Sequence, residues 1–418
     1  MKIIMNEHMY ITRNIEETIK NISYFLKNLL LIGPRGVGKS TLLKHLATDS
    51  ERTYVSLDDL MVRNLALTDP ALFLQRYNPP VIIDEIQYAP QLLNHIKSYI
   101  DQYGTNGNIW LTSSIRFAAL SDINDIFNKR VDIVDLHGLS LNEITKTKNL
   151  GYFVPTNNNL VSRAKATIHY SLKEIYKIIW QGSMPAIYND SDVEWRDFYA
   201  SYVQTLIHQD VMRILQINDE MVFFKFLCAA AAQTGRIVNY AELAKAAEIS
   251  APTAKQWVKT LEAIGIIYML QPFNPPGSKY VVRAPKLYFC DTGLAAYLTS
   301  WNNPEALETG AMSNEFFATW VVMEIYKSYT NSGLVPPLYY LRNFNGKELD
   351  LIIYENGVAY PVGISKSTLP NKMLKTFAIL TPVANDAQIK MGEGAIICFA
   401  DGLIKASENI SYVPAWMI

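Results

Sequence analysis

Apolar residues in the first third of the chain fall into short runs that alternate with helix-like patterns. Five runs have the length of one buried strand, at residues 29–32, 53–57, 81–83, 109–114 and 131–136. Helical spacing precedes or separates them, at residues 15–25, 41–47, 69–75 and 91–102. Strands that alternate with helices across short loops predict an α/β domain over residues 1–150, built on a doubly wound parallel sheet.

The pattern changes near residue 150, where a polar Thr-Asn-Asn-Asn stretch indicates a linker. From 160 to 232 the apolar spacing is helical, which predicts a helical domain. His208 and Asp210 lie in an aromatic-rich helix of this region. A catalytic role is the weaker interpretation, because no partner residues accompany them, so we expect them to pack or to cap the helix.

Residues 233–300 follow a different order. Two short helices are predicted at 240–247 and 252–264, followed by two strand-like runs at 265–271 and 279–282. This is the layout of a winged helix, whose second helix can enter the major groove of DNA. Residues 236–286 hold seven basic and three acidic side chains, a net +4. Lys255 and Lys259 are candidate DNA contacts, but such domains also serve as packing or protein-binding modules, and both interpretations stay open.

Composition narrows the class of protein. The chain has 418 residues, of which 49% are hydrophobic and 18% charged, with a net charge of −1. We therefore expect an ordinary globular protein of two or three domains without a general attraction to nucleic acid. Cys228, Cys290 and Cys398 are far apart, which argues against disulfides and zinc. Neither a signal peptide nor a membrane helix is expected, and we predict a cytoplasmic location.

The first strand leads into a glycine-rich loop that fits G-x-x-x-x-G-K-[ST]. Backbone N–H groups of such a loop, together with the N-terminus of the next helix, can surround a phosphate. The lysine is expected to reach the β- and γ-phosphates of ATP, and the serine to offer its hydroxyl to Mg²⁺. The predicted nucleotide-binding residues are Gly33, Pro34, Arg35, Gly36, Val37, Gly38, Lys39, Ser40 and Thr41.

An acidic pair, Asp84 and Glu85, lies at the end of the third strand. The carboxyl ends of parallel strands are where α/β proteins bind ligands, so we expect the pair beside the loop. Asp84 would hold Mg²⁺ together with Ser40, and Glu85 would polarise the attacking water. The alternative is a strand that ends in two solvated acids. The matched loop upstream favours the catalytic interpretation.

Four segments carry a resemblance: GPRGVGKSTLL, YVSLDD at 54–59, VIIDEIQYAP at 81–90 and LTSS at 111–114. They resemble the AAA+ ATPase domain of a widespread prokaryotic group of ATP-binding proteins with a C-terminal domain of unknown function. The resemblance implies that the hydroxyls of Thr112, Ser113 and Ser114 sense the γ-phosphate. The group usually has glycine at the position of Ser113. It also implies an arginine-finger role for Arg130, where the alternative is a solvated arginine before a strand.

The last segment, residues 305–418, resembles the PD-(D/E)xK restriction-endonuclease fold. Glu315 and Asp350 match its acidic positions, but Gly363-Ile364-Ser365 stands where Glu-x-Lys is needed. Lys366 is not expected to substitute, because alternate side chains of a strand face opposite ways. We predict a degenerate nuclease-like α/β domain that is kept for binding or assembly.

The sequence thus predicts an AAA+ protein that binds ATP and Mg²⁺ and hydrolyses ATP slowly, as a conformational switch. The alternatives are a DNA-binding regulator, a nucleotide-gated scaffold in which ATP is only a ligand, and a true nuclease. A homo-oligomer or a protein partner is a further hypothesis.

Overall fold

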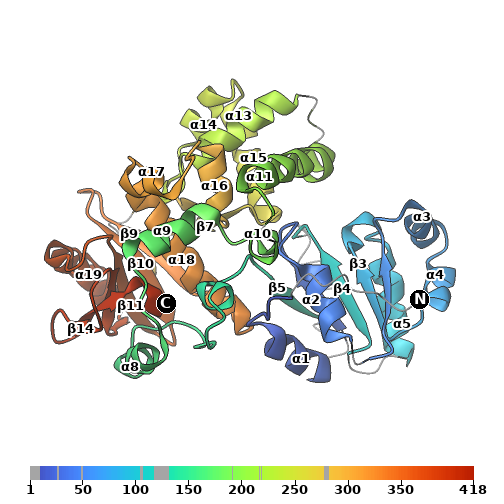
Figure 1. The fold of residues 1–418 in the computed structure, drawn as a ribbon, viewed down its shortest axis with the longest axis horizontal. Helices are drawn as coiled ribbons and strands as arrows, with labels where there is room; N and C mark the ends of the chain where they lie inside the picture. The colour runs from blue at the N-terminus through green and yellow to red at the C-terminus, as the bar shows by residue number, and fades with distance from the viewer. Residues whose placement is uncertain are drawn as a thin grey trace.

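The computed structural model describes residues 10–25, 28–48, 50–103, 107–116, 131–190, 192–215, 217, 219–276 and 282–418. A parallel sheet with its helices lies on one side of the molecule and a mixed sheet lies on the other, with helices between and above them (Figure 1). Every helix within the described ranges is too short or too polar to cross a membrane.

The first sheet is parallel and has five strands in the order β2-β3-β4-β1-β5. The strands are β1 (Asn28–Ile32), β2 (Thr53–Ser56), β3 (Val81–Asp84), β4 (Ile109–Ser113) and β5 (Val131–Asp135). Every residue of β1, β3 and β4 is buried, as expected for central strands covered on both faces. The predicted parallel sheet is confirmed, and each strand lies within one residue of its predicted bounds.

Helices precede and connect these strands. They are α1 (Glu16–Phe25), α2 (Lys39–Leu46), α3 (Leu60–Thr68), α4 (Pro70–Arg76), the short 3₁₀ turn η1 (Ile86–Tyr88) and α5 (Leu92–Tyr103). The sequence analysis did not predict α3, whose apolar residues lie on both its exposed and its buried face. Leu60 and Met61 are 73% and 81% exposed, whereas Ala66 is buried and Val62 and Leu65 pack against the core. A cap begins this helix: the side chain of Asp59 accepts the N–H groups of Met61 and Val62.

The middle of the chain is helical, as predicted. Ser171 and Glu174 form a capping box that begins α9. A π-helical segment, η2, continues α11 and brings Asp210 into a buried position. The elements are α7 (Leu141–Ile144), α8 (Asn157–Ala166), α9 (Leu172–Gln181), α10 (Pro185–Asn189), α11 (Trp195–Thr205), η2 (Leu206–Val211), α12 (Met212–Leu215) and α13 (Glu220–Ala231).

A small antiparallel sheet follows, with strand order β6-β8-β7. Its strands are β6 (Arg236–Ile237), β7 (Ile267–Leu270) and β8 (Lys286–Phe289), and the two helices α14 (Tyr240–Ala246) and α15 (Ala251–Ala263) lie between β6 and β7 in the chain. Both helices are where the pattern predicts them. Most of the second predicted strand, at residues 279–281, lies outside the described residues, and β8 is the partner of β7.

The C-terminal sheet has seven strands in the order β14-β15-β13-β11-β10-β9, with β12 beside β11. Its first three strands in the chain are β9 (Leu338–Arg342), β10 (Glu348–Glu355) and β11 (Val358–Ile364). The other elements are α16 (Thr292–Leu298), α17 (Pro304–Thr309), α18 (Ser313–Asn331), η3 (Asn371–Ile379), α19 (Leu380–Asp386), β12 (Lys390–Met391), β13 (Gly394–Cys398), β14 (Ile404–Lys405), β15 (Ile410–Pro414) and η4 (Ala415–Met417).

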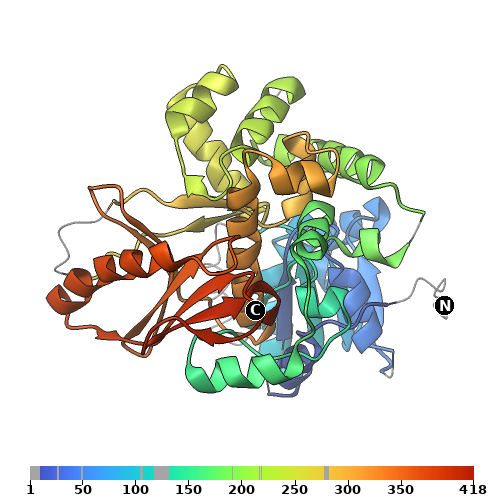
Figure 2. The ribbon, with the colours of Figure 1, turned by 60° about the vertical axis from the view of Figure 1, so that its left-hand side comes forward.

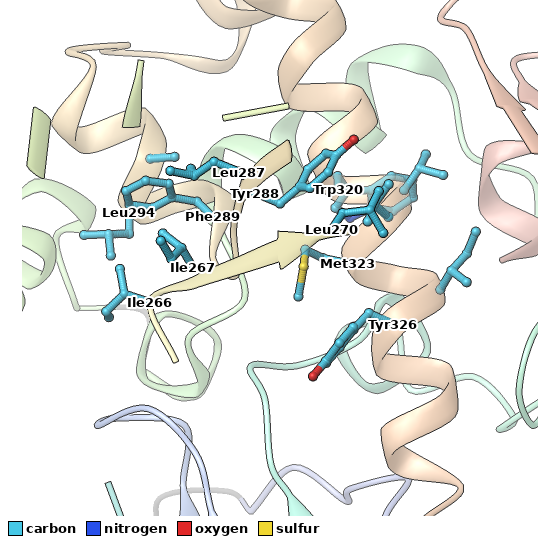
Figure 3. Close-up of a cluster of buried hydrophobic side chains, with 14 of the residues drawn as sticks. Ile266, Ile267, Leu270, Leu287, Tyr288, Phe289, Leu294, Trp320, Met323 and Tyr326 are labelled. Carbon is cyan, nitrogen blue, oxygen red and sulfur yellow. The ribbon is translucent and has the colours of Figure 1, made fainter. Parts of the chain in front are cut away.

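Helix α18 joins the parts of the molecule. It runs between the C-terminal sheet and the rest of the chain (Figure 2), and buried residues occur on all of its faces. Trp320, Met323 and Tyr326 point from α18 toward β7 and β8 (Figure 3). One continuous hydrophobic core therefore links the parallel sheet, the small sheet and the C-terminal sheet.

Candidate active site

The glycine-rich loop follows β1 and has the backbone that its sequence predicts. Gly36 and Gly38 adopt φ of +83° and +93°, in the left-handed region that favours glycine. A Cβ on Gly33 would lie 2.1 Å from the carbonyl oxygen of Leu136. Helix α2 begins immediately after the loop, so its N-terminal N–H groups face the space that the loop encloses.

Lys39, the first residue of α2, is buried in this loop. Its ammonium donates to the carbonyl oxygens of Gly33 and Pro34, at 2.8 and 3.0 Å, and to Ser114 Oγ at 3.1 Å. Burial lowers the pKa of Lys39, and the nearby carboxylates of Glu85 and Asp84 oppose that shift. The amine is thus held at the loop by neutral oxygens, which a phosphate group can replace.

The carboxylate of Asp84 accepts hydrogen bonds from hydroxyl groups on three elements. Ser40 Oγ lies 2.9 and 2.8 Å from its two carboxylate oxygens, and Tyr54 donates its hydroxyl at 2.6 Å. Thr112 on β4 donates a short hydrogen bond to the same carboxylate. The Ser40–Asp84 pair is an oxygen donor set of the kind that Mg²⁺ prefers. Both residues therefore fit the predicted metal role.

Glu85 lies directly after β3 and adopts φ +60° and ψ +50°, a left-handed conformation that is strained for a non-glycine residue. Ser114 Oγ lies 2.9 Å from both of its carboxylate oxygens, and Gln87 donates a further short hydrogen bond. Its own N–H donates to Thr112 Oγ at 2.9 Å. Strain of this kind is typical of functional sites. Ser114 connects the Glu85 carboxylate to Lys39, because its hydroxyl contacts both.

Two of the three predicted sensor hydroxyls contact Lys39, Asp84 or Glu85, and the third does not. Thr112 contacts Asp84, and Ser114 contacts both Lys39 and Glu85, but Ser113 Oγ donates to the carbonyl oxygen of Ile115 at 2.8 Å. Alternation along β4 explains the difference, because residues two apart lie on the same side of a strand. The same alternation is the signal that would have favoured Ser114 over Ser113.

Two contacts with the loop come from distant parts of the chain. Arg35 pairs with Asp210 of η2 at 3.3 Å, and Gly265 packs on Pro34 so closely that a Cβ there would lie 2.9 Å from Pro34 Cγ. Burial raises the pKa of Asp210, and Arg35 opposes that rise. Asp210 therefore does more than pack within its own helix. No local pattern could have indicated these contacts.

The remaining site candidates are dispersed. Arg130 lies outside the described residues. Lys255 and Lys259 are exposed and lie four residues apart on α15, so they share one face of the helix. Glu315 forms a salt bridge with Arg236 at 2.7 Å.

Asp350 is partly buried and accepts the N–H of Ile364 at 2.8 Å. Burial raises the pKa of its carboxyl group to about 6. Lys366 lies beyond the end of β11, and its amine donates to the Glu308 carbonyl and to Ser313 Oγ. Within the residues that the structure describes, no group of three or more His, Cys, Asp or Glu side chains could hold a metal ion.

Comparison with known proteins divides the chain into three matched parts. Residues 26–145 match a family described as an AAA domain. Residues 172–305 and 314–418 each match a domain of unknown function, DUF8612 and DUF4143 respectively. Uncharacterized proteins of Mycobacterium tuberculosis (Rv2008c) and Mycobacterium bovis (Mb2031c) are both 23% identical over 394 residues, which cover 93% of this chain and 80% of each relative.

Solved structures give distant similarities. The Walker-type ATPase PABY2304 of Pyrococcus abyssi is 12% identical with a TM-score of 0.44, and the match covers 70% of this chain and 97% of that one. AMPPCP-bound DnaA of Aquifex aeolicus is 13% identical with a TM-score of 0.29, covering 59% and 85%. The AAA match supports the predicted AAA+ ATP-binding class for the first part of this chain.

Proposed function

We propose that this protein binds Mg·ATP at the loop of residues 33–41 and hydrolyses ATP slowly, as a conformational switch. The observation that carries the proposal is the contact of Ser40 with both carboxylate oxygens of Asp84, at 2.9 and 2.8 Å, one residue from the buried Lys39. A phosphate-binding lysine and an oxygen donor set for Mg²⁺ are thereby adjacent, which is the arrangement that phosphoryl transfer needs.

Each side chain has a specific part in this proposal. Lys39 neutralises charge on the β- and γ-phosphates, after it leaves the carbonyl groups of Gly33 and Pro34. Ser40 and Asp84 hold Mg²⁺, which neutralises phosphate charge when bound. Glu85 orients the attacking water and accepts its proton.

Slow turnover is proposed because Glu85 is already engaged. Its carboxylate accepts hydrogen bonds from Ser114 and Gln87, and these must loosen before it can accept a proton from water. Arg130 remains a candidate arginine finger, and its contribution from a second copy of the chain would accelerate the reaction.

The proposed switch connects the loop to α15. Gly265, just after α15, packs on Pro34 of the loop, and Ala263 at the end of α15 accepts the N–H of Arg116 at 2.7 Å. Arg116 lies two residues after Ser114, which contacts Lys39 and Glu85. A change at the phosphate site would therefore reach α15 along two short routes.

Nucleotide binding tests the proposal directly. Calorimetric titration with Mg·ATP is expected to give saturable binding to the wild type, and Lys39→Ala is expected to weaken it by at least about tenfold, the loss of one charge-assisted hydrogen bond to phosphate. Unchanged affinity in Lys39→Ala would refute the assignment of this loop.

DNA binding is a second candidate function. The order α13, β6, α14, α15, β7, β8 supports a winged helix, and Lys255 and Lys259 on the exposed face of α15 could contact phosphates of duplex DNA. For the C-terminal domain we propose a binding or assembly role rather than DNA cleavage, since Glu315 is paired with Arg236 and Gly363-Ile364-Ser365 stands where Glu-x-Lys is needed. A cytoplasmic location and a homo-oligomer remain proposals.

A further inference from the structure

Tyr54 contacts the proposed Mg²⁺ site from β2, the edge strand of the parallel sheet. Ser56, two residues further along β2, lies opposite Asp84 of β3 in the register of the sheet. Since alternate residues of a strand face the same way, Tyr54 lies on the same side of β2 as Ser56. The Tyr54 hydroxyl donates to Asp84 Oδ2 at 2.6 Å. A residue outside the phosphate loop and the acidic pair therefore contacts a proposed metal ligand.

The two oxygens of the Asp84 carboxylate are held by two different strands. Tyr54 on β2 donates to Oδ2, and Thr112 on β4 donates to Oδ1. Ser40 Oγ contacts both oxygens, at 2.9 and 2.8 Å. When the Ser40 hydroxyl turns toward a metal ion, the bonds from Tyr54 and Thr112 still fix the orientation of the carboxylate.

The ring of Tyr54 carries a cation on its face. Lys44 Nζ lies 3.6 Å from the centroid of this ring. Ser40 and Lys44 are four residues apart on α2, so one face of the helix presents Ser40 to Asp84 and, one turn later, Lys44 to Tyr54. A cation attracts the electron density of a phenol ring, which makes the hydroxyl a stronger hydrogen-bond donor.

We propose that Tyr54 is a positioning residue of the Mg²⁺ site, where its hydroxyl orients the Asp84 carboxylate for the metal ion, and that Lys44 acts on the site through the Tyr54 ring. The inference rests on the proposed Mg·ATP binding and adds two residues to it. Groups that hydrogen-bond a metal-ligating carboxylate orient it, and their loss typically lowers metal affinity by about 10- to 100-fold.

The test separates metal binding from nucleotide binding. ATP is titrated by calorimetry into each protein, once with saturating Mg²⁺ and once with EDTA, and the ratio of the two affinities measures the contribution of the metal ion. Ser40→Ala removes a proposed metal ligand and sets the lowest ratio. Tyr99→Phe is the matched control, because Tyr99 is another partly buried tyrosine of the same domain, on α5.

Tyr54→Phe keeps the ring and removes only the hydroxyl. We expect it to lower the ratio roughly tenfold, while ATP affinity in EDTA stays within about twofold of wild type and so reports an intact loop. Tyr99→Phe should change neither quantity. Lys44→Met should lower the ratio about threefold when Tyr54 is present, and it should have no further effect in Tyr54→Phe, because it acts through the hydroxyl.

The outcomes distinguish this inference from the proposed function. A wild-type ratio in Tyr54→Phe, together with a lower ratio in Ser40→Ala, would overturn the role of Tyr54 alone. Equal losses from Lys44→Met with and without the Tyr54 hydroxyl would overturn the route through the ring. Equal ratios in wild type and Ser40→Ala would overturn the metal assignment on which the inference rests. Absence of ATP binding under both conditions would overturn the proposed function as well.

Discussion

Arg35 of the phosphate loop forms a salt bridge of 3.3 Å with Asp210, 175 residues later in the chain. The side chains are 21% and 6% exposed, so the pair is shielded from water and weakly screened. The hydroxyl of Tyr88 accepts a further hydrogen bond from the same guanidinium at 3.3 Å. The salt bridge thereby attaches helix η2 to Arg35 in the phosphate loop.

The contributions of Arg35 and Asp210 to the free energy of unfolding should be coupled. Arg35→Ala and Asp210→Ala should each lower the free energy of unfolding by about 1–3 kcal/mol, because each leaves a partly buried charge without its partner. The double variant should cost less than the sum, with a coupling of about 1 kcal/mol or more. Urea unfolding of the four proteins measures this cycle, and strictly additive losses would show that the bridge contributes nothing.

Ser114 and Ser113 form a matched pair for the sensor position. Ser114→Ala removes a hydroxyl that contacts both Lys39 and Glu85, and we expect ATP turnover to change by roughly tenfold while ATP binding changes less. Ser113→Ala removes a hydroxyl that bonds only within its own turn, to Ile115, and should leave turnover within about twofold. A larger effect from Ser113 than from Ser114 would reverse this assignment.

The raised pKa of Asp350 predicts a dependence of stability on pH. Burial raises its pKa to about 6, so between about pH 4 and 6 the folded protein holds a proton that the unfolded chain releases. Stability should therefore fall as pH rises through this window. Relative to Asp350→Asn, wild type should lose about 1–3 kcal/mol between pH 4 and 7. Thermal melting of both proteins at several pH values measures this difference, and parallel curves would contradict it.

DNA binding through α15 can be separated from general charge attraction. Lys255→Glu with Lys259→Glu should abolish a salt-dependent affinity for duplex DNA, because phosphate contacts release counterions. Lys173→Glu with Lys177→Glu is the matched control, since these lysines are also exposed and four residues apart, on α9. Equal losses in both double variants, measured by fluorescence anisotropy, would indicate charge alone rather than a winged-helix contact.

The sequence predicts those parts of the site that depend on local spacing. Lys39 and Ser40 are fixed by the loop pattern, and Asp84 and Glu85 by an apolar run that ends in acids, so both could be placed at one edge of a parallel sheet. The contacts Arg35–Asp210 and Lys44–Tyr54 could not be predicted, because they join segments whose proximity is decided by packing. Helix α3 was missed because its apolar residues occur on both its exposed and its buried face, so that no single apolar stripe marks it.

The most direct test of the account is steady-state ATP hydrolysis by wild type and Glu85→Gln, with Lys39→Ala as the background and ATP binding measured in parallel. Wild type should turn over slowly but above the Lys39→Ala rate, and Glu85→Gln should lose about 100-fold or more while it still binds ATP, because the group that activates water is gone. Equal turnover in wild type and Glu85→Gln would contradict the catalytic role of Glu85. ATP binding without any turnover by wild type would contradict the ATPase account and favour a nucleotide-gated scaffold.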